Sequence, residues 1–349
     1  MSTFTAGLGI LGGVVLAAVV GWNAWTTRRL TPRQAETPPR VEPTPAAEPV
    51  EPTLESGFTV SGEEQDDVPP LPLPEKKPGL DALIDAIAPI ATDGPVSGEA
   101  AIAALPATRR AGSKPFNIEG LDAITGHWET PQAGHRYTAF QAGVQLANRL
   151  GPVNEIEFSE FVMKAQAFAD AVNGSPEFPE MLHEVSRARE LDQFAGGHDA
   201  QLGFTLRARH AAWSPGYVHQ NAARLGFIAG AIPGRMVLPA AQAGSPPILV
   251  LSFDTQAALA EDPTQAAIRD VTLSLDVPQV HRTERPFMRM CEAAIALAGG
   301  MDGVITDDNG QVIQGPGMDV IAADLEKLYD MLESRDLAAG SSLARRLFS

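Results

Sequence analysis

Hydrophobic and polar positions divide the chain into an apolar start, a proline-rich stretch and a patterned second half. Residues 6–25 (AGLGILGGVVLAAVVGWNAW) contain no Asp, Glu, Lys, Arg or His. A helix of about 20 mostly apolar residues is long enough to span the hydrocarbon core of a bilayer. The pattern therefore predicts a single transmembrane helix over 6–25, with residues 1–5 as a short extracytoplasmic N-terminus.

The charges that flank this apolar run predict its orientation. Arg28, Arg29 and Arg33 follow it, whereas residues 1–5 carry no charged side chain. Because positive residues are retained on the cytoplasmic side, the N-terminus is expected outside and the rest of the chain in the cytoplasm. A cleaved signal peptide is the alternative, but such a peptide would normally have a basic stretch before its apolar run.

Residues 26–113 are rich in proline and acidic side chains. Residues 37–54 read TPPRVEPTPAAEPVEPTL, and residues 63–78 read EEQDDVPPLPLPEKKP. Closely spaced prolines favour extended polyproline II, and few apolar side chains are present to offset the entropy of ordering. The composition predicts a largely disordered linker that holds the rest of the chain away from the membrane.

Two short apolar runs lie at the end of this linker. Leu80, Leu83 and Ile84 follow helical spacing until Pro89, and the run 100–105 ends before another proline. Because proline interrupts a helix, each run is at most a short helix. They are interpreted as transient or docked helices, or as linear motifs for a partner.

From Gln201 to Ser334, strand and helix patterns alternate. Apolar side chains occupy every second position at 202–206 and at 271–277, which is typical of half-buried strands. Ser214 before Pro215 predicts the N-cap and first turn of a helix. The expected strands are 201–206, 235–238, 248–253, 270–277, 303–306 and 312–313, and the expected helices are 215–225, 286–298 and 319–334.

These elements predict an α+β fold of split β-α-β-like type, with one mostly antiparallel sheet and helices on one face. The other sheet face would then meet solvent or a partner. Residues 114–200 form an additional α/β region, either part of the same fold or a degenerate repeat. It has strand patterns at 116–121 and 140–146, and helix patterns at 158–172 and 180–194. Residues 335–349 are left as a C-terminal tail.

Charge and candidate chemistry exclude several function classes. The formal net charge of −17 argues against nucleic-acid binding, which needs basic surface. Cys291 is the only cysteine, so there is no internal disulfide, as expected in a reducing cytoplasm. None of the seven histidines forms a ligand pair, and no nucleophile elbow or phosphate-binding loop occurs. We therefore expect no catalytic residue, metal site, cofactor or small-molecule substrate.

Four segments of the second half carry a resemblance to a known family. They read ARLGFIAG (223–230), PPILVLSF (246–253), VTLSLDVP (271–278) and MDGVITDDNGQVI (301–313). Together with the N-terminal anchor and the Pro-rich linker, they resemble the ZipA family, which binds the bacterial division protein FtsZ. The resemblance covers the anchor and residues 201–334, an FtsZ-binding domain in that family. It implies the inner membrane as location and cell division at the septum as the process.

The resemblance also implies a binding face. In the family, the solvent-facing side of the sheet binds the C-terminal tail peptide of FtsZ. Because alternate residues of a strand point to the same side of the sheet, the resemblance implies eight positions on this face: Gln201, Gly203, Thr205, Ile232, Leu251, Phe253, Thr272 and Ser274. Several of them are polar or glycine where the family pattern leads one to expect apolar side chains. Leu251 and Phe253 would be the main anchors if they face outward, because buried aromatic and aliphatic contacts dominate such interfaces.

The sequence thus predicts a non-enzymatic, membrane-anchored adaptor that ties FtsZ polymers to the membrane. A groove with a dissociation constant of about 10 µM, or roughly −7 kcal/mol, would suffice because many tethered copies face one polymer. The alternative is a membrane-tethered scaffold for another cytoplasmic partner, or an enzyme whose site lies in 114–196.

Overall fold

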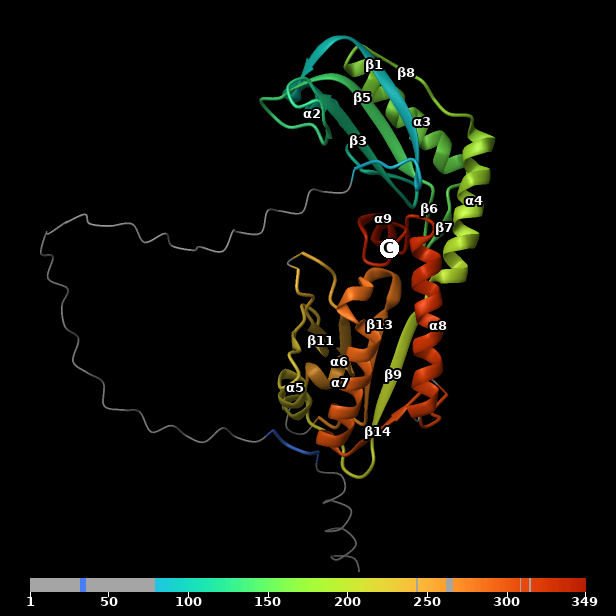
Figure 1. Cartoon of the computed structure of the whole chain (residues 1–349). Coiled ribbons are helices and arrows are strands. Elements are labelled where there is room, and N and C mark those ends of the chain that lie inside the picture. The colour runs from blue at the N-terminus through green and yellow to red at the C-terminus, as the bar shows by residue number, and fades with distance from the viewer. Residues whose placement is uncertain (1–31, 36–78, 243, 262–265, 308, 314) are drawn as a thin grey trace, which may run out of the picture.

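The computed structural model describes residues 32–35, 79–242, 244–261, 266–307, 309–313 and 315–349. They form two α+β units, with α4 along the side of both and α9 between them (Figure 1). The predicted helix 6–25 and the linker segment 36–78 lie outside the described residues. Within those residues, no helix combines the length and apolar character needed to cross a bilayer.

The first unit, 79–198, is built on an antiparallel sheet of order β2-β3-β5-β1-β8, with β4 paired to β3. Its strands are β1 (Asp85–Ser97), β2 (Arg110–Ala111), β3 (Lys114–Asp122), β4 (Trp128–Glu129), β5 (Arg136–Gln145) and β8 (Gly174–Pro176). Its helices are α2 (Gly98–Ala104), α3 (Glu155–Ala171) and α4 (Met181–His198). A separate ribbon pairs β6 (Ala147–Asn148) with β7 (Gly151–Pro152).

The second unit, from residue 201, has an antiparallel sheet of order β10-β11-β12-β13-β9-β14. Its strands are β9 (Gln201–Ala208), β10 (Ile228–Ala229), β11 (Arg235–Leu238), β12 (Leu249–Ser252), β13 (Asp270–Asp276) and β14 (Gly303–Thr306). Its helices are α5 (Pro215–Ala223), α6 (Thr255–Ala258), α7 (Pro286–Met301), α8 (Gly315–Glu333) and α9 (Ser342–Leu347). The expected α+β class with antiparallel sheets is confirmed.

The two units share one topology. In the first, β1 lies between β5 and β8, and α3 connects those two outer strands across β1. In the second, β9 lies between β13 and β14, and α7 makes the same connection. Each unit also has a helix after this enclosed strand, α2 or α5, and a last helix after its final strand, α4 or α8. The repeated plan begins at residue 79 rather than at residue 114.

The expected linker therefore ends earlier than the sequence pattern indicated. The interpretation of the apolar run from Leu80 as a helix is wrong: β1 is an interior strand of the first sheet, between β5 and β8, and Ala86, Ala88 and Ile90 lie in the core. Pro89 fits inside this strand because its carbonyl accepts a hydrogen bond from the Glu177 backbone, on the side away from β5. The missing N–H thus takes no bond from the β1–β5 ladder.

Most elements of the second unit lie where the pattern predicted them. Ser214 caps α5 by accepting from the Tyr217 backbone N–H, and Pro215 is the first helical residue. The stripe Phe287, Met290, Ala294 and Leu297 of α7 is buried. Residues 335–349 are not a free tail, because α9 docks between the units and Phe348 is buried in the second core.

Polar contacts join the two units beside α9. Arg149 bridges Asp199 and Asp276, at 2.6 and 2.7 Å. The Gln145 side chain donates to the Arg346 carbonyl at 2.8 Å, and Arg346 forms an ion pair with Asp85. Burial raises the pKa of the Asp85 carboxyl despite this arginine. The units are therefore held by directed contacts as well as by α4.

Residues 32–35 dock on the second unit (Figure 1). Arg33 forms a parallel bridge with Trp213: its N–H donates to Ala212 at 2.7 Å, and its carbonyl accepts from Ser214 at 2.9 Å. The Arg33 guanidinium also pairs with Asp302 at 2.8 Å. The chain thus meets the second unit directly after the predicted anchor, and 36–78 connects this contact to the first unit.

Candidate functional site

The outward face of the second sheet brings together five of the eight sequence-predicted binding residues. On β9 and β13, Thr205 pairs with Thr272 and Gly203 pairs with Ser274, so their side-chain positions share one face. Gln201 is exposed on the same face, and the other four are half-buried. The alternation of β9 and β13 was therefore sufficient to assign their faces from sequence.

Leu251 and Phe253 do not belong to this face. Leu251 pairs with the core residue Leu273, is fully buried, and is part of the second core, and Phe253 is 8% exposed there. Their interpretation as outward-facing anchors is wrong. The residues of β12 that do face outward are Val250 and Ser252, opposite Ser274 and Thr272.

Ile232 lies apart from the strands, in the turn between β10 and β11. It is 52% exposed. Its neighbour along the chain, Arg235, is exposed and sits opposite Ser252 in the sheet. Ile232 therefore stands at the β10–β11 end of the sheet rather than over the β9–β13 ladder.

A groove of about 300 Å³ opens over this face. Its lining includes Val250, Ser274, Pro246, Arg235 and Gln201. Asp276 also lines the groove and forms an ion pair with Arg149. The groove thus combines apolar surface, hydroxyl and amide groups, one arginine and one paired carboxylate, which suits an extended peptide better than a chemical reaction. Pro246 and Val250 belong to the PPILVLSF segment. Because consecutive positions there are apolar, the sequence does not show which side chains face the core and which face outward.

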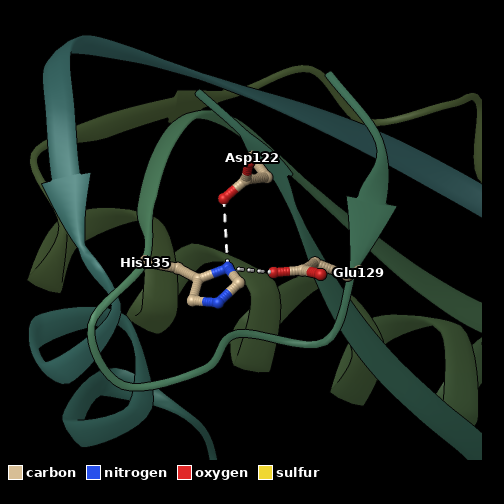
Figure 2. A group of neighbouring side chains, drawn as sticks. All are labelled: Asp122, Glu129 and His135. Atoms are coloured by element: carbon tan, nitrogen blue, oxygen red, sulfur yellow. Dashed lines mark hydrogen bonds and ion pairs between the residues drawn. The ribbon is translucent and has the colours of Figure 1, made fainter. Parts of the chain in front are cut away.

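A second cluster lies in the first unit, where Asp122, Glu129 and His135 converge (Figure 2). They come from the end of β3, from β4 and from the loop before β5, and their ligand-type atoms lie within 4.8 Å of one another. His135 Nδ1 lies 3.1 Å from Asp122 and 2.8 Å from Glu129. The three residues share no close sequence motif, so their grouping was not predicted from the sequence.

The hydrogen bonds around this cluster define its chemistry. Both neighbours of His135 Nδ1 are carboxylate oxygens, so Nδ1 must carry a proton and donate it. Backbone N–H groups of Thr125 and Ile124 hold the pKa of Asp122 below its usual range. This arrangement closes the end of the β3–β5 hairpin. These hydrogen bonds give the cluster a structural role in holding the segment between β3 and β5.

Tyr137 completes the cluster from β5. Its hydroxyl donates to Glu129 at 2.9 Å and accepts from the Gln132 backbone N–H at 2.7 Å. Burial raises the pKa of Tyr137 to about 12, so the hydroxyl keeps its proton at neutral pH. The ring thereby anchors the loop that carries Glu129 and His135.

Comparison with known proteins adds no assignment. No protein-family model matches the chain, and no curated protein is significantly similar to it.

Proposed function

We propose that this protein is a membrane-anchored adaptor that binds the C-terminal tail of FtsZ on the outward face of the second sheet. In this proposal the apolar run 6–25 holds the chain in the bacterial inner membrane, and the sheet holds FtsZ polymers there during cell division. The protein acts without catalysis. The groove over Val250 and Ser274 is the observation that carries the proposal.

The chemistry of the groove supports a peptide ligand. Pro246 and Val250 offer apolar contact, and Ser274 and Gln201 offer hydrogen-bonding groups for a peptide backbone. Arg235 is exposed at the edge and complements an acidic side chain or a terminal carboxylate. With Leu251 and Phe253 in the core, the groove has few deep apolar anchors, which fits the low affinity expected of an adaptor with many copies.

The docked segment 32–35 limits how far the second unit can lie from the membrane in such an adaptor. Seven residue steps separate Trp25 from Pro32, and an extended chain covers at most about 25 Å over that distance. If 6–25 spans the bilayer, the second unit lies near the membrane surface. The linker 36–78 then does not hold it away, contrary to the interpretation from sequence. An FtsZ polymer bound there would run close to the bilayer.

Peptide binding tests the proposal directly. Full-length protein in nanodiscs should bind a labelled FtsZ tail peptide in an anisotropy titration, with a dissociation constant of about 10 µM. Val250→Asp should weaken binding at least fivefold by placing a charge in the groove. Full-length protein is needed because a chain that starts at Lys114 would lack β1, an interior strand of the first sheet.

A matched control variant is available in the first unit. Ile124 is 91% exposed in the turn after β3, so Ile124→Asp should leave peptide binding unchanged. Phe253→Asp is not a useful variant, because it would place a charge in the core. Absence of binding at about 500 µM peptide, with the protein folded, would refute the proposal, as would equal weakening by Ile124→Asp.

A further inference from the structure

A cavity of about 490 Å³ separates α7 from α8, on the helical side of the second sheet. The two helices run in opposite directions (Figure 1), because the chain turns back along β14, where Val312 bridges Thr306 in antiparallel fashion, before α8 begins. The first half of α8, 315–324, contains no buried residue among those described, whereas Leu325, Leu328 and Leu332 further along are buried. The start of α8 therefore stands away from α7.

Apolar side chains dominate the walls of this cavity. They are Phe287, Met288 and Cys291 from α7, and Met318, Ala322 and Leu325 from α8. Two carboxylates, Asp319 and Glu326, also line the cavity, and Glu326 forms an ion pair with Arg282. Small-molecule sites in proteins are typically apolar cavities of roughly 300–1,000 Å³ with a few placed polar groups. The volume and the lining both match that description.

Tyr329 is a polar group of the cavity that lacks a partner. Its side chain lines the cavity and is 3% exposed, and within the described part of the chain its hydroxyl makes no hydrogen bond. A buried hydroxyl is normally satisfied. Its neighbour Arg282 lies over the Tyr329 ring, 5.6 Å from the centroid, and is engaged by Glu326, Asp330 and Glu333.

Arg285 supplies an exposed cation at the same end of the cavity. It precedes α7, and its guanidinium contacts the Met288 sulfur at 3.8 Å. Among the described residues it forms no ion pair with a carboxylate, whereas Arg282 beside it is fully occupied. An arginine in this state offers a planar donor group that matches an incoming carboxylate.

We propose that the cavity binds a long-chain fatty acid, with its acyl chain between α7 and α8 and its carboxylate at Arg285. The apolar walls exclude water around the chain, and Arg285 balances the one charge of the ligand. A chain held at a membrane, as proposed above, would meet such molecules in the adjacent bilayer. The cavity and the groove for the FtsZ tail lie on opposite sides of the second sheet, so either site stands without the other.

Cys291 provides a direct readout of occupancy, because it lines the cavity and is the only cysteine in the chain. Full-length protein in nanodiscs is alkylated with N-ethylmaleimide, with and without palmitate, and the rate of Cys291 modification is followed by mass spectrometry. Palmitate at about ten times its dissociation constant should slow the reaction roughly tenfold, in proportion to the unoccupied fraction. Butyrate, which lacks the long chain, should have no effect.

Two adjacent alanines make a matched pair of variants. Ala322→Trp fills the cavity, so Cys291 should react slowly and palmitate should have no further effect. Ala323 is exposed on the outer side of α8, so Ala323→Trp should behave as the unmodified protein. Arg285→Gln should raise the palmitate concentration needed for protection at least fivefold.

The proposal is overturned if palmitate leaves the rate unchanged in folded protein, or if it protects Ala322→Trp as strongly as the unmodified protein. Hexadecanol, which has the long chain but no carboxylate, distinguishes the contribution of the acyl chain from that of the charge. Weak protection by hexadecanol supports the carboxylate at Arg285, and protection equal to that by palmitate refutes it. FtsZ peptide binding is measured on the same samples, so a failure of one site is distinguished from a failure of the other.

Discussion

The two units share a topology but differ where their last two helices meet. In the first unit, Phe161 of α3 packs edge-on against Phe178 at 6.1 Å and lies 6.0 Å from Phe116 of the sheet. Ala188 of α4 is fully buried in the same core. In the second unit, α7 and α8 leave a cavity of about 490 Å³. Aromatic rings thus pack between α3, the sheet and the segment before α4 in the first unit, whereas the second unit has a cavity between α7 and α8.

The first turns of α3 and α7 also differ, because the one in the first unit has side-chain caps and the one in the second has none. Asn154 and Glu157 form a capping box at α3. By contrast, α7 begins after Arg285, which has a left-handed backbone (φ 48°) and makes no side-chain cap. The first unit thus has a packed core and a capped helix start, whereas the second contains both the groove and the cavity.

Truncation of a side chain on α3 and of one on α8 should give the largest difference in stability between the two units. Phe161→Ala should destabilise the first unit by about 3–5 kcal/mol, because it removes a buried ring from a packed core. Met318→Ala should cost about 1 kcal/mol or less, because this side chain is only half-buried beside the cavity. Hydrogen exchange of each unit measures both values, and equal costs would contradict the contrast between the two units.

The sequence predicts those elements of the fold whose residue pattern depends on local environment alone. The periodicity of 271–277 and the Ser214-Pro215 start predicted β13 and α5 correctly, because each pattern reports one local environment. The strand β1 was missed because Leu80, Leu83 and Ile84 precede it with helical spacing and Pro89 suggested a break. Its place was decided by hydrogen bonds to β5 and β8, which are distant in the chain.

Substitutions at the starts of α3 and α7 should change the stability of these helices in opposite directions. Asn154→Ala should destabilise α3 by about 1–2 kcal/mol, since it removes the side-chain cap. Arg285→Gly should stabilise the start of α7 by roughly 1 kcal/mol, because glycine tolerates the left-handed backbone. Exchange rates of the first-turn amides provide the measurement. A loss of stability in Arg285→Gly would mean that its side chain supports the helix.

Acid should affect the first unit through Glu157. Although burial opposes it, hydrogen bonds from Ser113 and Asn154 hold the pKa of this carboxyl below its usual value of 4.5. The ionised form therefore stabilises the folded state above that value, and the contribution is lost as pH falls through the folded pKa. Denaturation of Glu157→Gln should show a smaller loss of stability below pH 4.5, and an unchanged acid profile would disprove this role.

The smallest effect is expected where the chain docks after the predicted anchor. Arg33→Glu breaks a partly exposed pair with Asp302, worth about 1 kcal/mol or less. The Ser214 N–H, which donates to the Arg33 carbonyl, should exchange faster. Arg207→Glu breaks the exposed pair with Asp270 and should leave Ser214 unaffected. Equal exchange in the two variants would argue against docking through Arg33.

The candidate sites were less accessible to sequence reasoning than the strands around them. In PPILVLSF every strand position but Ser252 is apolar, so alternation could not show that Leu251 faces the core and Val250 faces outward. The spacing of Met318, Ala322 and Leu325 predicts one apolar face. It cannot show that α8 stands away from α7, because that depends on the volume of side chains from both helices.

The proposed binding of the FtsZ tail on the outward face of the second sheet can be tested by crosslinking. Full-length protein in nanodiscs, with a photo-crosslinking amino acid in place of Ser274, is mixed with FtsZ polymers. We expect a crosslink that maps to the FtsZ C-terminal tail and is lost when that tail is deleted. Contradiction would come from equal crosslinking at Ala139, on the outward face of the first sheet, or from FtsZ recruitment without a crosslink at Ser274.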